Sequence, residues 1–348
     1  MSEQRLRIID ANLNRAGEGL HLLEEIARLT LDDAELTRKL KAMRHEVLRG
    51  DLAFNKELIQ ARDSEGDVGV AIKTPGEEKE LPIILVANSR RVQEALRVLE
   101  EMAKVPDVKP ELDPDKFKKA RFDLYTIERA LLSRLLRRDK AGRLSGLYAI
   151  IDSQKLGKRD HVEVAGQLIR GGAKAIQLRY KSDDRDESLA IAKKLKSLCY
   201  ENKVLFIVND YLDIALAAGA DGLHLGQKDL PVTEARRLLP IDMILGVSVT
   251  TVEQAKAAEG GGADYIAVGS MYPTSSKETA RVVGLERLRE VRGAVSLPLV
   301  AIGGINRDNA GEVAAAGADG VAVISAILGV EDMERAARQL VKAFEAGK

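Results

Sequence analysis

The stretch FIVND, at residues 206–210, passes from three apolar residues to an amide, Asn209, and a carboxylate, Asp210. A second stretch, GLHLGQKD at residues 222–229, passes in the same way from an apolar run to the carboxylate of Asp229. Short apolar runs of this kind are typical of buried strands. We therefore expect two strands whose ends carry acidic side chains, and the function of the protein depends on what those acids hold.

Residues 144–348 contain eight such apolar runs, and stretches with helical periodicity separate them. The expected strands are LYAIID (147–152), AIQLRY (175–180), VLFIVND (204–210), GLHLG (222–226), MILGVSV (243–249), YIAVGSM (265–271), LVAIGGI (299–305) and GVAVIS (320–325). Eight strand–helix units in about 200 residues predict an α/β fold, a (β/α)8 TIM barrel at the small end of its size range. A doubly wound open sheet is the main alternative.

A recurring turn favours the barrel. The sequence reads GGAK, AGAD, GGAD and AGAD before the second, fourth, sixth and eighth expected strands, around Ala173, Ala220, Ala263 and Ala318. In each copy a glycine can end the preceding helix in a left-handed conformation before the chain re-enters the sheet. Because these turns lie at the N-terminal face of a barrel, we interpret them as structural.

Residues 1–140 predict a separate all-α bundle. ANLNRAGEGLHLLEEIA, from Ala11, and ANSRRVQEALRVLEEMA, from Ala87, share the frame A-N-x-x-R-x-x-E-x-L-x-x-L-E-E-x-A, and the copies are 76 residues apart. A second helical stretch follows each copy, which predicts two similar hairpins with pseudo-twofold symmetry. We expect the bundle to serve docking or oligomerisation, so a homo-oligomer is expected, and we expect its R-x-x-E faces to be exposed.

The composition excludes several classes of protein. The 348 residues include 54 Lys and Arg and 54 Asp and Glu, which argues against a general binder of polyanions such as nucleic acid. The sequence has neither an apolar signal core nor a run of about 20 apolar residues that could span a membrane. Its single cysteine, Cys199, excludes a disulfide framework. We expect a cytoplasmic protein that acts on small molecules.

The C-terminal strand ends, where barrel enzymes carry their active sites, are rich in groups that bind phosphate. Arginine and lysine neutralise phosphate charge, while hydroxyls and glycine amides donate hydrogen bonds to its oxygens. The side chains fall into two clusters, which predicts two phosphorylated substrates. The expected positions are Gln177, Arg179, Lys181, Asn209, Asp210, Gln227, Asp229, Ser248, Thr274, Ser275, Ser276, Lys277, Gly303, Gly304 and Ser325.

The two acids suggest a metal. Asp210 and Asp229 are expected on adjacent loops, and a carboxylate pair can bind magnesium together with phosphate oxygens of a substrate. Proton-transfer groups are scarce, since only His224 lies in an expected strand and we interpret it as a packed core residue. Such a site suits a reaction in which a diphosphate leaves a carbon that can carry positive charge, and a second phosphorylated molecule then attacks.

Residues 144–348 contain seven motifs in this order: QLRYK, VND, HLGQKD, GVSV, YPTSSK, AIGGI and VISAI. These motifs and their order resemble those of the thiamine-phosphate synthase family. The resemblance implies a transferase that joins 4-amino-2-methyl-5-hydroxymethylpyrimidine diphosphate to 4-methyl-5-(2-phosphoethyl)thiazole. The products would be thiamine monophosphate and pyrophosphate. It also implies one magnesium ion per active site, and departure of the diphosphate before the thiazole nitrogen attacks. The helical part resembles an N-terminal extension of some family members.

The resemblance assigns three roles. It implies that the pyrimidine diphosphate is held by Gln177, Leu178, Arg179, Tyr180, Lys181, Asn209, Ser248 and Lys277. It implies that magnesium is bound by Asp210 and Asp229. It implies that the thiazole phosphate is held by Thr274, Ser275, Ser276, Gly304, Ile324 and Ser325. The expected catalytic residues are Arg179, Lys181, Asn209, Ser248 and Lys277.

Two positions depart from the family pattern. Tyr180 stands where the family commonly has glutamate, and Ser276 stands where it commonly has threonine, which keeps the hydroxyl. Tyr148, on the first expected strand, either faces the pyrimidine or packs in the barrel. The alternative functions are a thiazole tautomerase-like isomerase, a ribulose-phosphate epimerase-like enzyme and a non-catalytic sensor of a phosphorylated ligand. The expected strand ends lack the metal-binding histidines that the epimerase requires.

Overall fold

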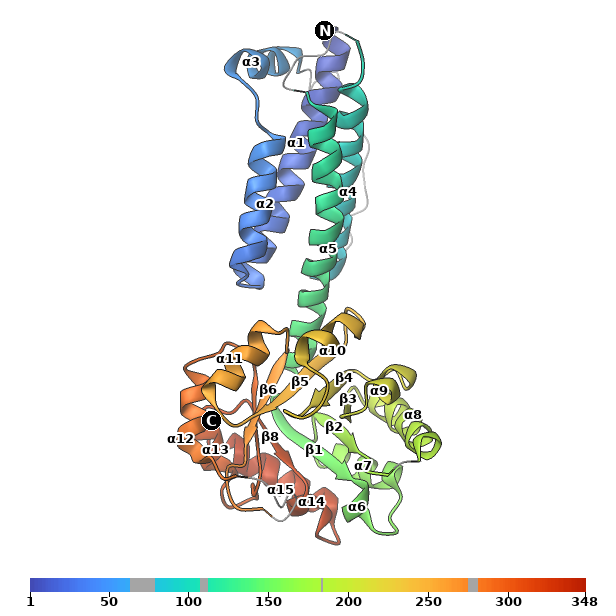
Figure 1. Ribbon diagram of the computed structural model, residues 1–348, viewed down its shortest axis with the longest axis vertical. Coiled ribbons are helices and arrows are strands. Elements are labelled where there is room, and N and C mark those ends of the chain that lie inside the picture. The colour runs from blue at the N-terminus through green and yellow to red at the C-terminus, as the bar shows by residue number, and fades with distance from the viewer. Residues whose placement is uncertain (63–78, 107–111, 183, 275–280) are drawn as a thin grey trace. The chain divides into compact units, whose positions relative to one another are not determined.

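The computed structural model describes residues 1–62, 79–106, 112–182, 184–274 and 281–348. Three expected site residues, Ser275, Ser276 and Lys277, lie outside the described residues. The described chain forms two compact units, Met1–Leu136 and Arg137–Lys348 (Figure 1). The expected boundary was residues 140–144, so the last few residues of the expected helical domain belong to the second unit.

The first unit is entirely helical in its described part. Its elements are α1 (Glu3–Glu25), the π-helical turn η1 (Ile26–Thr30), α2 (Ala34–Val47), α3 (Leu52–Ala61), α4 (Leu81–Met102) and α5 (Pro114–Gly142). The four long helices α1, α2, α4 and α5 run side by side (Figure 1). The short helix α3 was not predicted, although Asp51 caps it by accepting a hydrogen bond from the backbone N–H of Phe54 at 2.7 Å.

The sequence repeat corresponds to a structural repeat. Helices α1 and α4 carry its two copies and pack against each other. The equivalent apolar positions of both copies are buried: Ala16, Leu20, Leu23 and Ala27 in the first, and Val92, Leu96, Leu99 and Ala103 in the second. The R-x-x-E residues Arg15, Glu18, Arg91 and Glu94 are exposed, as expected for a solvated face.

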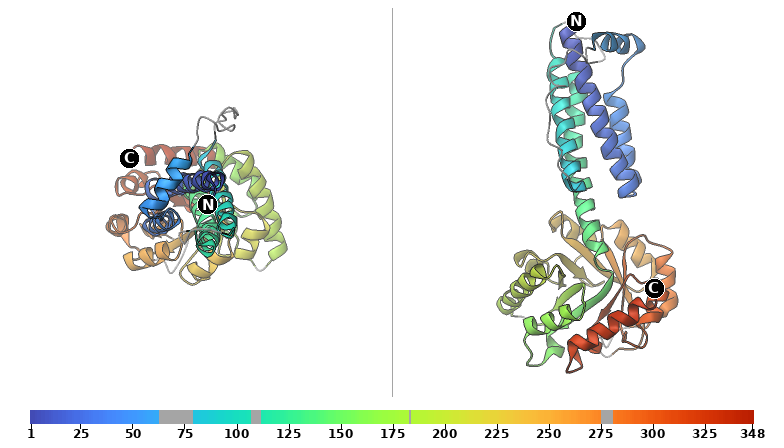
Figure 2. Two further views of the ribbon diagram at one scale, coloured as in Figure 1. Left: turned by 90° about the horizontal axis from the view of Figure 1, so that it is seen from above. Right: turned by 180° about the vertical axis from the view of Figure 1, so that it is seen from behind.

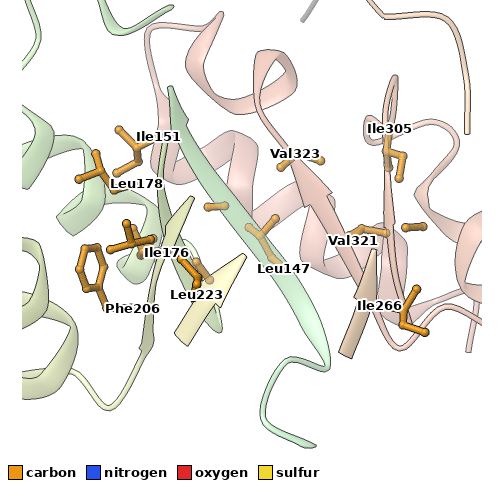
Figure 3. Packing of buried hydrophobic residues seen from close by; sticks show 14 of the residues in the cluster. Leu147, Ile151, Ile176, Leu178, Phe206, Leu223, Ile266, Ile305, Val321 and Val323 are labelled. Atoms are coloured by element: carbon orange, nitrogen blue, oxygen red, sulfur yellow. The ribbon is translucent and has the colours of Figure 1, made fainter. Parts of the chain in front are cut away.

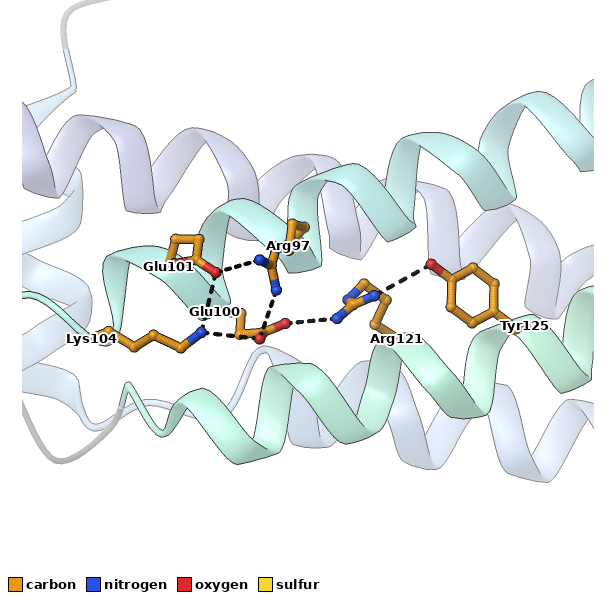
Figure 4. A network of polar contacts seen from close by, with 6 residues as sticks. All are labelled: Arg97, Glu100, Glu101, Lys104, Arg121 and Tyr125. Carbon is orange, nitrogen blue, oxygen red and sulfur yellow. Dashed lines mark hydrogen bonds and ion pairs between the residues drawn. The ribbon is translucent and has the colours of Figure 1, made fainter.

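A buried glutamate in each copy links the two helices of its hairpin. Glu24 on α1 accepts a hydrogen bond from Arg44 Nε on α2 at 3.0 Å. Its equivalent on α4, Glu100, accepts a hydrogen bond from Arg121 on α5 at 2.9 Å (Figure 4). Because each carboxylate is buried beside its own arginine, loss of that arginine would leave an uncompensated charge in the packed hairpin.

The second unit contains eight strands that alternate with helices. Its elements are β1 (Gly146–Asp152), α6 (Ser153–Leu156), α7 (His161–Arg170), β2 (Ala175–Arg179), α8 (Arg185–Glu201), β3 (Leu205–Asn209), α9 (Leu212–Ala217), β4 (Gly222–Leu225), α10 (Val232–Leu238), β5 (Ile244–Val249), α11 (Val252–Gly260), β6 (Tyr265–Gly269), α12 (Gly284–Arg292), β7 (Leu299–Ile302), α13 (Ala310–Ala315), β8 (Gly320–Val323), α14 (Ser325–Leu328) and α15 (Met333–Glu345). The ends of each strand lie within three residues of the ends that the sequence predicted.

The eight strands close into a parallel barrel in sequence order. Strand β1 pairs with β2 on one side and with β8 on the other, which confirms the predicted barrel and excludes the open sheet. The helices of this unit surround the strands (Figure 2). Outward-facing side chains such as Ile176, Phe206 and Val321 fill the layer between strands and helices (Figure 3).

The recurring glycine turns have the expected conformation. Gly172, Gly219, Gly262 and Gly317 all have positive φ values, between 63° and 102°, which disfavour any residue with a Cβ. In three of the turns the following aspartate accepts a hydrogen bond from the backbone of the neighbouring strand, as Asp264 does from Leu245 N at 2.8 Å. These turns therefore stabilise the end of the barrel opposite the strand termini that carry the expected site.

The end of α5 belongs to the barrel unit. Arg137 donates to Asp264 at 2.8 Å, and Lys140 donates to the carboxylate of Asp242 at 2.7 Å. Ala141, in the last turn of α5, is buried in the cluster of apolar side chains inside the barrel. These contacts explain why the boundary lies at residues 136–137 and not at residues 140–144.

Candidate active site

A cavity of about 680 Å³ lies at the C-terminal ends of the barrel strands. We call it the mouth cavity. It brings together thirteen of the expected site residues: Gln177, Arg179, Lys181, Asn209, Asp210, Gln227, Asp229, Ser248, Thr274, Gly303, Gly304, Ile324 and Ser325. These residues come from seven different strands or the loops that follow them, so the closed barrel collects positions that are up to 148 residues apart in the sequence, from Gln177 to Ser325.

Two expected residues have side chains directed elsewhere. Leu178 is buried in the layer between strands and helices (Figure 3), and Tyr180 is buried in the same layer with its hydroxyl hydrogen-bonded to Glu187. Alternate residues of a strand point to opposite faces, so Gln177 and Arg179 face the cavity while Leu178 and Tyr180 do not. Any contact of Leu178 or Tyr180 with a substrate would have to come from the backbone.

The two acids that the sequence singled out are neighbours in the mouth cavity. Asp210 follows β3 with a φ of 65°, and its N–H donates to the carbonyl of His224 on β4 at 2.9 Å. Asp229 lies on the loop after β4 and accepts a hydrogen bond from Gly226 N at 2.6 Å. Burial, together with the charge and hydrogen bonding of Asp229, raises the pKa of Asp210 to about 6, although Lys181 and Arg179 act to lower it.

Asp152, at the end of β1, holds Arg179 in place. Its carboxylate is almost fully buried and forms an ion pair with the Arg179 guanidinium. The other carboxylate oxygen accepts a hydrogen bond from Gln154 N at 3.1 Å, which begins α6. Asp152 was not among the expected site residues, although the run LYAIID ends in an acid in the same way as FIVND.

The loop after β7 packs its backbone tightly against the segment that follows β6. Gly303 and Gly304 have φ values of 99° and 68°. A Cβ on Gly303 would lie 2.0 Å from Ser270 Oγ, and a Cβ on Gly304 would lie 2.6 Å from the carbonyl of Pro273. Only glycine fits both positions, and the two glycines border the cavity beside Thr274, Ile324 and Ser325.

The floor of the mouth cavity is polar, and of its three aromatic residues the sequence had suggested a place at the site only for Tyr148. Tyr148, His224 and Tyr265 line it and are buried. The Tyr148 and Tyr265 hydroxyls lie 2.9 Å apart, and His224 Nδ1 lies 3.0 Å from Tyr265 Oη. His224 is therefore hydrogen-bonded on the cavity floor and is not simply packed among apolar residues. Arg281, on the rim, also lines the cavity and was not predicted.

Residues 147–327, which include all eight strands apart from the first residue of β1, match the thiamine monophosphate synthase family. The chain is 39% identical over 350 residues to the thiamine-phosphate synthase of Thermosynechococcus vestitus, an alignment that covers 99% of this chain and 97% of that protein. The chain belongs to the thiamine-phosphate synthase family.

Other comparisons agree with this membership. The chain is 52% identical over 195 residues to the thiamine-phosphate synthase of Methanospirillum hungatei, which covers 56% of this chain and 95% of that protein. A solved structure of a thiamine phosphate pyrophosphorylase from Pyrococcus furiosus is 42% identical, with a TM-score of 0.55, and covers 60% of this chain and 98% of that one. Residues 7–130, which lie in the helical unit, match the ThiD2 family.

As a member of the thiamine-phosphate synthase family, the protein is a transferase that makes thiamine monophosphate in thiamine biosynthesis and acts on small-molecule substrates. This confirms the function that the ordered motifs implied. Within the described ranges we find no helix with the length and apolar character needed to cross a bilayer.

Proposed function

We propose that the mouth cavity joins the pyrimidine diphosphate to the thiazole phosphate by departure of the diphosphate before the thiazole nitrogen attacks. The observation that supports this mechanism most directly is the pair Asp210 and Asp229 beside the cations Arg179 and Lys181. A carboxylate pair next to two cations suits a diphosphate that arrives with a divalent metal ion. The cavity residues include no exposed cysteine, and His224 is already hydrogen-bonded on both ring nitrogens.

The two carboxylates fit a magnesium ion. Burial raises the pKa of Asp210, and the neighbouring Asp229 carboxylate raises it further, so a cation shared by the two would stabilise the charged form of Asp210. Among the described residues no group of three or more His, Cys, Asp or Glu side chains is placed to hold a metal. Two carboxylates are nevertheless sufficient for magnesium, because it takes its remaining ligands from water and substrate phosphates. When bound, the ion would neutralise the charge that develops on the departing diphosphate.

The residues of this chain then bind and orient the two substrates. Arg179, with its guanidinium fixed by Asp152, and Lys181 would neutralise the diphosphate, and Asn209 would donate to it from the end of β3. Gln177 and Ser248, deeper in the cavity, would contact the pyrimidine end of that substrate. The resemblance to the family implies that Lys277 would bind the same substrate.

The second substrate would lie on the opposite side of the mouth cavity. Thr274 and Ser325 supply hydroxyls, and Gly304, which also lines the cavity, would supply its backbone N–H. With the thiazole phosphate held here, its ring nitrogen needs only to be oriented toward the reacting carbon. Ser275 and Ser276 extend this cluster in the sequence.

Release of pyrophosphate tests the mechanism. The full-length chain is mixed with both substrates and magnesium, and pyrophosphate and thiamine monophosphate are measured together. We expect the two products in equal amounts, and none when EDTA removes the metal. An isomerase of the tautomerase type or a sensor would release no pyrophosphate. Equal rates with and without EDTA would refute the role of magnesium.

We propose that the helical unit mediates self-association. Its large exposed apolar side chains, among them Leu29, Leu52 and Ile59, support this role. Size-exclusion chromatography of the full chain and of residues 137–348 tests the proposal. The shorter chain begins at Arg137 because Arg137 and Lys140 bind barrel residues. We expect the shorter chain to form a smaller oligomer, and an unchanged oligomeric state would refute the proposal.

A further inference from the structure

A continuous set of hydrogen bonds crosses the floor of the mouth cavity. Gln177 Nε2 on β2 donates to Tyr148 Oη at 2.9 Å, and Tyr148 Oη lies 2.9 Å from Tyr265 Oη. Tyr265 Oη lies 3.0 Å from His224 Nδ1, and His224 Nε2 lies 2.8 Å from Ser248 Oγ. We call these five residues the floor network. Its two ends, Gln177 and Ser248, are the residues that we assign to the pyrimidine.

Each hydroxyl of the floor network has one hydrogen to donate, so when every link is made by donation along the chain of residues, the links all run in one direction or all in the other. In the direction that starts from the Gln177 N–H, the Tyr148 hydroxyl donates to Tyr265, and the Tyr265 hydroxyl donates to His224 Nδ1. The imidazole then carries its hydrogen on Nε2 and donates it to Ser248. In this direction the Gln177 amide offers its carbonyl oxygen to the cavity, and Ser248 offers its hydroxyl hydrogen.

Tyr265 is the centre of the floor network. Its side chain is fully buried, and burial raises the pKa of both Tyr265 and Tyr148, so the two hydroxyls keep their hydrogens. A Cβ on Gly246, in the neighbouring strand β5, would lie 2.0 Å from Tyr265 Cζ. Glycine at this position therefore leaves the space that the phenol ring occupies. A phenylalanine ring would fill the same space, so packing alone does not require the hydroxyl.

We propose that Tyr265 is a positioning residue whose hydroxyl sets the direction of the floor network. In that direction the floor selects a flat ring that offers a hydrogen-bond donor to Gln177 and an acceptor to Ser248. This inference rests on the proposed function, because the 4-aminopyrimidine carries an exocyclic N–H donor and ring nitrogens that accept. The 4-oxo analogue of the same diphosphate offers a carbonyl oxygen where the amine stood.

The floor network has one other self-consistent direction, which gives the proposal a sharp alternative. If Ser248 donated to His224, every link would reverse and the Gln177 amide would offer its N–H group to the cavity. The floor would then favour the 4-oxo ring. Without the Tyr265 hydroxyl the two halves of the network are no longer coupled, so the Gln177 amide can turn to suit either ring.

The experiment compares binding of the two ring types. The full-length chain with magnesium is titrated by calorimetry with the 4-aminopyrimidine diphosphate and with its 4-oxo analogue. We expect wild type to bind the amino compound about a hundredfold more tightly, and Tyr265→Phe to reduce that preference about tenfold. A preference of wild type for the 4-oxo compound, or an equal loss of affinity for both compounds in the variant, would overturn the proposal.

Two further variants separate positioning from a structural effect. Leu223→Ala removes a buried side chain from the outer face of β4, so it should lower the melting temperature and leave the preference unchanged. Tyr148→Phe cuts the floor network at the next link and should reduce the preference as Tyr265→Phe does. If Tyr265→Phe does not fold, Tyr148→Phe decides the question by the same measurement.

Pyrophosphate release by wild type, measured in parallel, separates this inference from the proposed function. Release together with an unchanged preference in both tyrosine variants would overturn only the role of Tyr265. Absence of release would overturn the proposed function, while the ratio of binding affinities still tests the floor network. Binding of neither compound by wild type would overturn both.

Discussion

Replacing Asp210 by asparagine is expected to stabilise the metal-free protein and to slow catalysis. The φ of 65° at Asp210 is one that asparagine adopts more readily than most residues, so the backbone should keep its course. Burial and the nearby Asp229 carboxylate raise the pKa of Asp210 to about 6 from the usual 3.8. In the absence of metal, the charged form of Asp210 is therefore unfavourable in the folded protein.

The sign of the pH dependence follows from this pKa. Because the pKa is higher in the folded state, the contribution of Asp210 to stability is fully present below pH 3.8 and is lost as the pH rises through about 6. One pKa unit corresponds to about 1.4 kcal/mol, so the full loss is about 3 kcal/mol at neutral pH. The side chain borders an open cavity, and screening by solvent reduces this to about 1–2 kcal/mol.

Urea unfolding in EDTA measures the effect. We expect Asp210→Asn to be about 1–2 kcal/mol more stable than wild type near pH 7.5, and the difference to vanish near pH 4. Asp213→Asn, which changes an exposed carboxylate on α9, should have no such effect and serves as the control. A stability difference that does not depend on pH would show that Asp210 and Asp229 do not repel each other, and the reasoning for a shared metal would be wrong.

Asp210→Asn should also reduce turnover while it keeps its affinity for the thiazole phosphate. We expect kcat to fall about a hundredfold, because the lost carboxylate acts on departure of the diphosphate. The affinity for the thiazole phosphate, measured separately by calorimetry, should stay within about twofold of wild type. An equal loss of turnover and thiazole phosphate affinity would count against the proposed mechanism.

Three other predictions test separate parts of the molecule. Asp152→Asn should raise KM for the pyrimidine diphosphate about tenfold, with KM for the thiazole phosphate unchanged, because Arg179 loses the carboxylate that orients it; steady-state kinetics with each substrate varied checks this. Gly303→Ala should weaken binding of the thiazole phosphate, measured by calorimetry, and lower the free energy of unfolding, measured in urea, by about 2 kcal/mol or more. Gly293→Ala is the control, because Gly293 has an ordinary φ of −73°, and it should change neither quantity. Glu100→Gln should cost about 2–3 kcal/mol near pH 7 in the same assay. Burial acts to raise the pKa of Glu100, but its hydrogen bonds and the nearby cations outweigh burial and lower the pKa from 4.5 to about 2 (Figure 4). The stability difference between wild type and Glu100→Gln should therefore shrink as the pH falls from 4.5 toward 2.

Much of the site was predictable because the signals are local. The runs that end at Asn209 and Asp210 and at Asp229 placed both acids at strand ends, and the closed barrel brings them into one cavity. Because alternate residues of a strand point to opposite faces, Leu178 and Tyr180 face away from the side on which Gln177 and Arg179 lie. The expectation that all residues of the motif QLRYK bind substrate did not take this alternation into account. Asp152 carried the same signal as Asp210 and was missed because it stands outside the family motifs.

The floor network was not predictable from the sequence. Tyr148 and Tyr265 are 117 residues apart and His224 lies between them, and nothing in the neighbourhood of any of the three indicates its partner. A lone histidine in an apolar strand is more often packed than hydrogen-bonded, so the expectation for His224 followed from its surroundings in the sequence. Only the register of the closed barrel places the three side chains on one floor.

The sequence by itself determined the elements, their order and the chemistry at their ends. Periodicity, glycine turns and the repeat at Ala11 and Ala87 are properties of neighbouring residues, so they are readable without a structure. The tertiary structure decided which other side chains meet: Asp152 with Arg179, and the tyrosines of the floor network with each other and with His224. The physical reason is that the barrel closes between β1 and β8, and closure sets distances between residues that no local interaction connects.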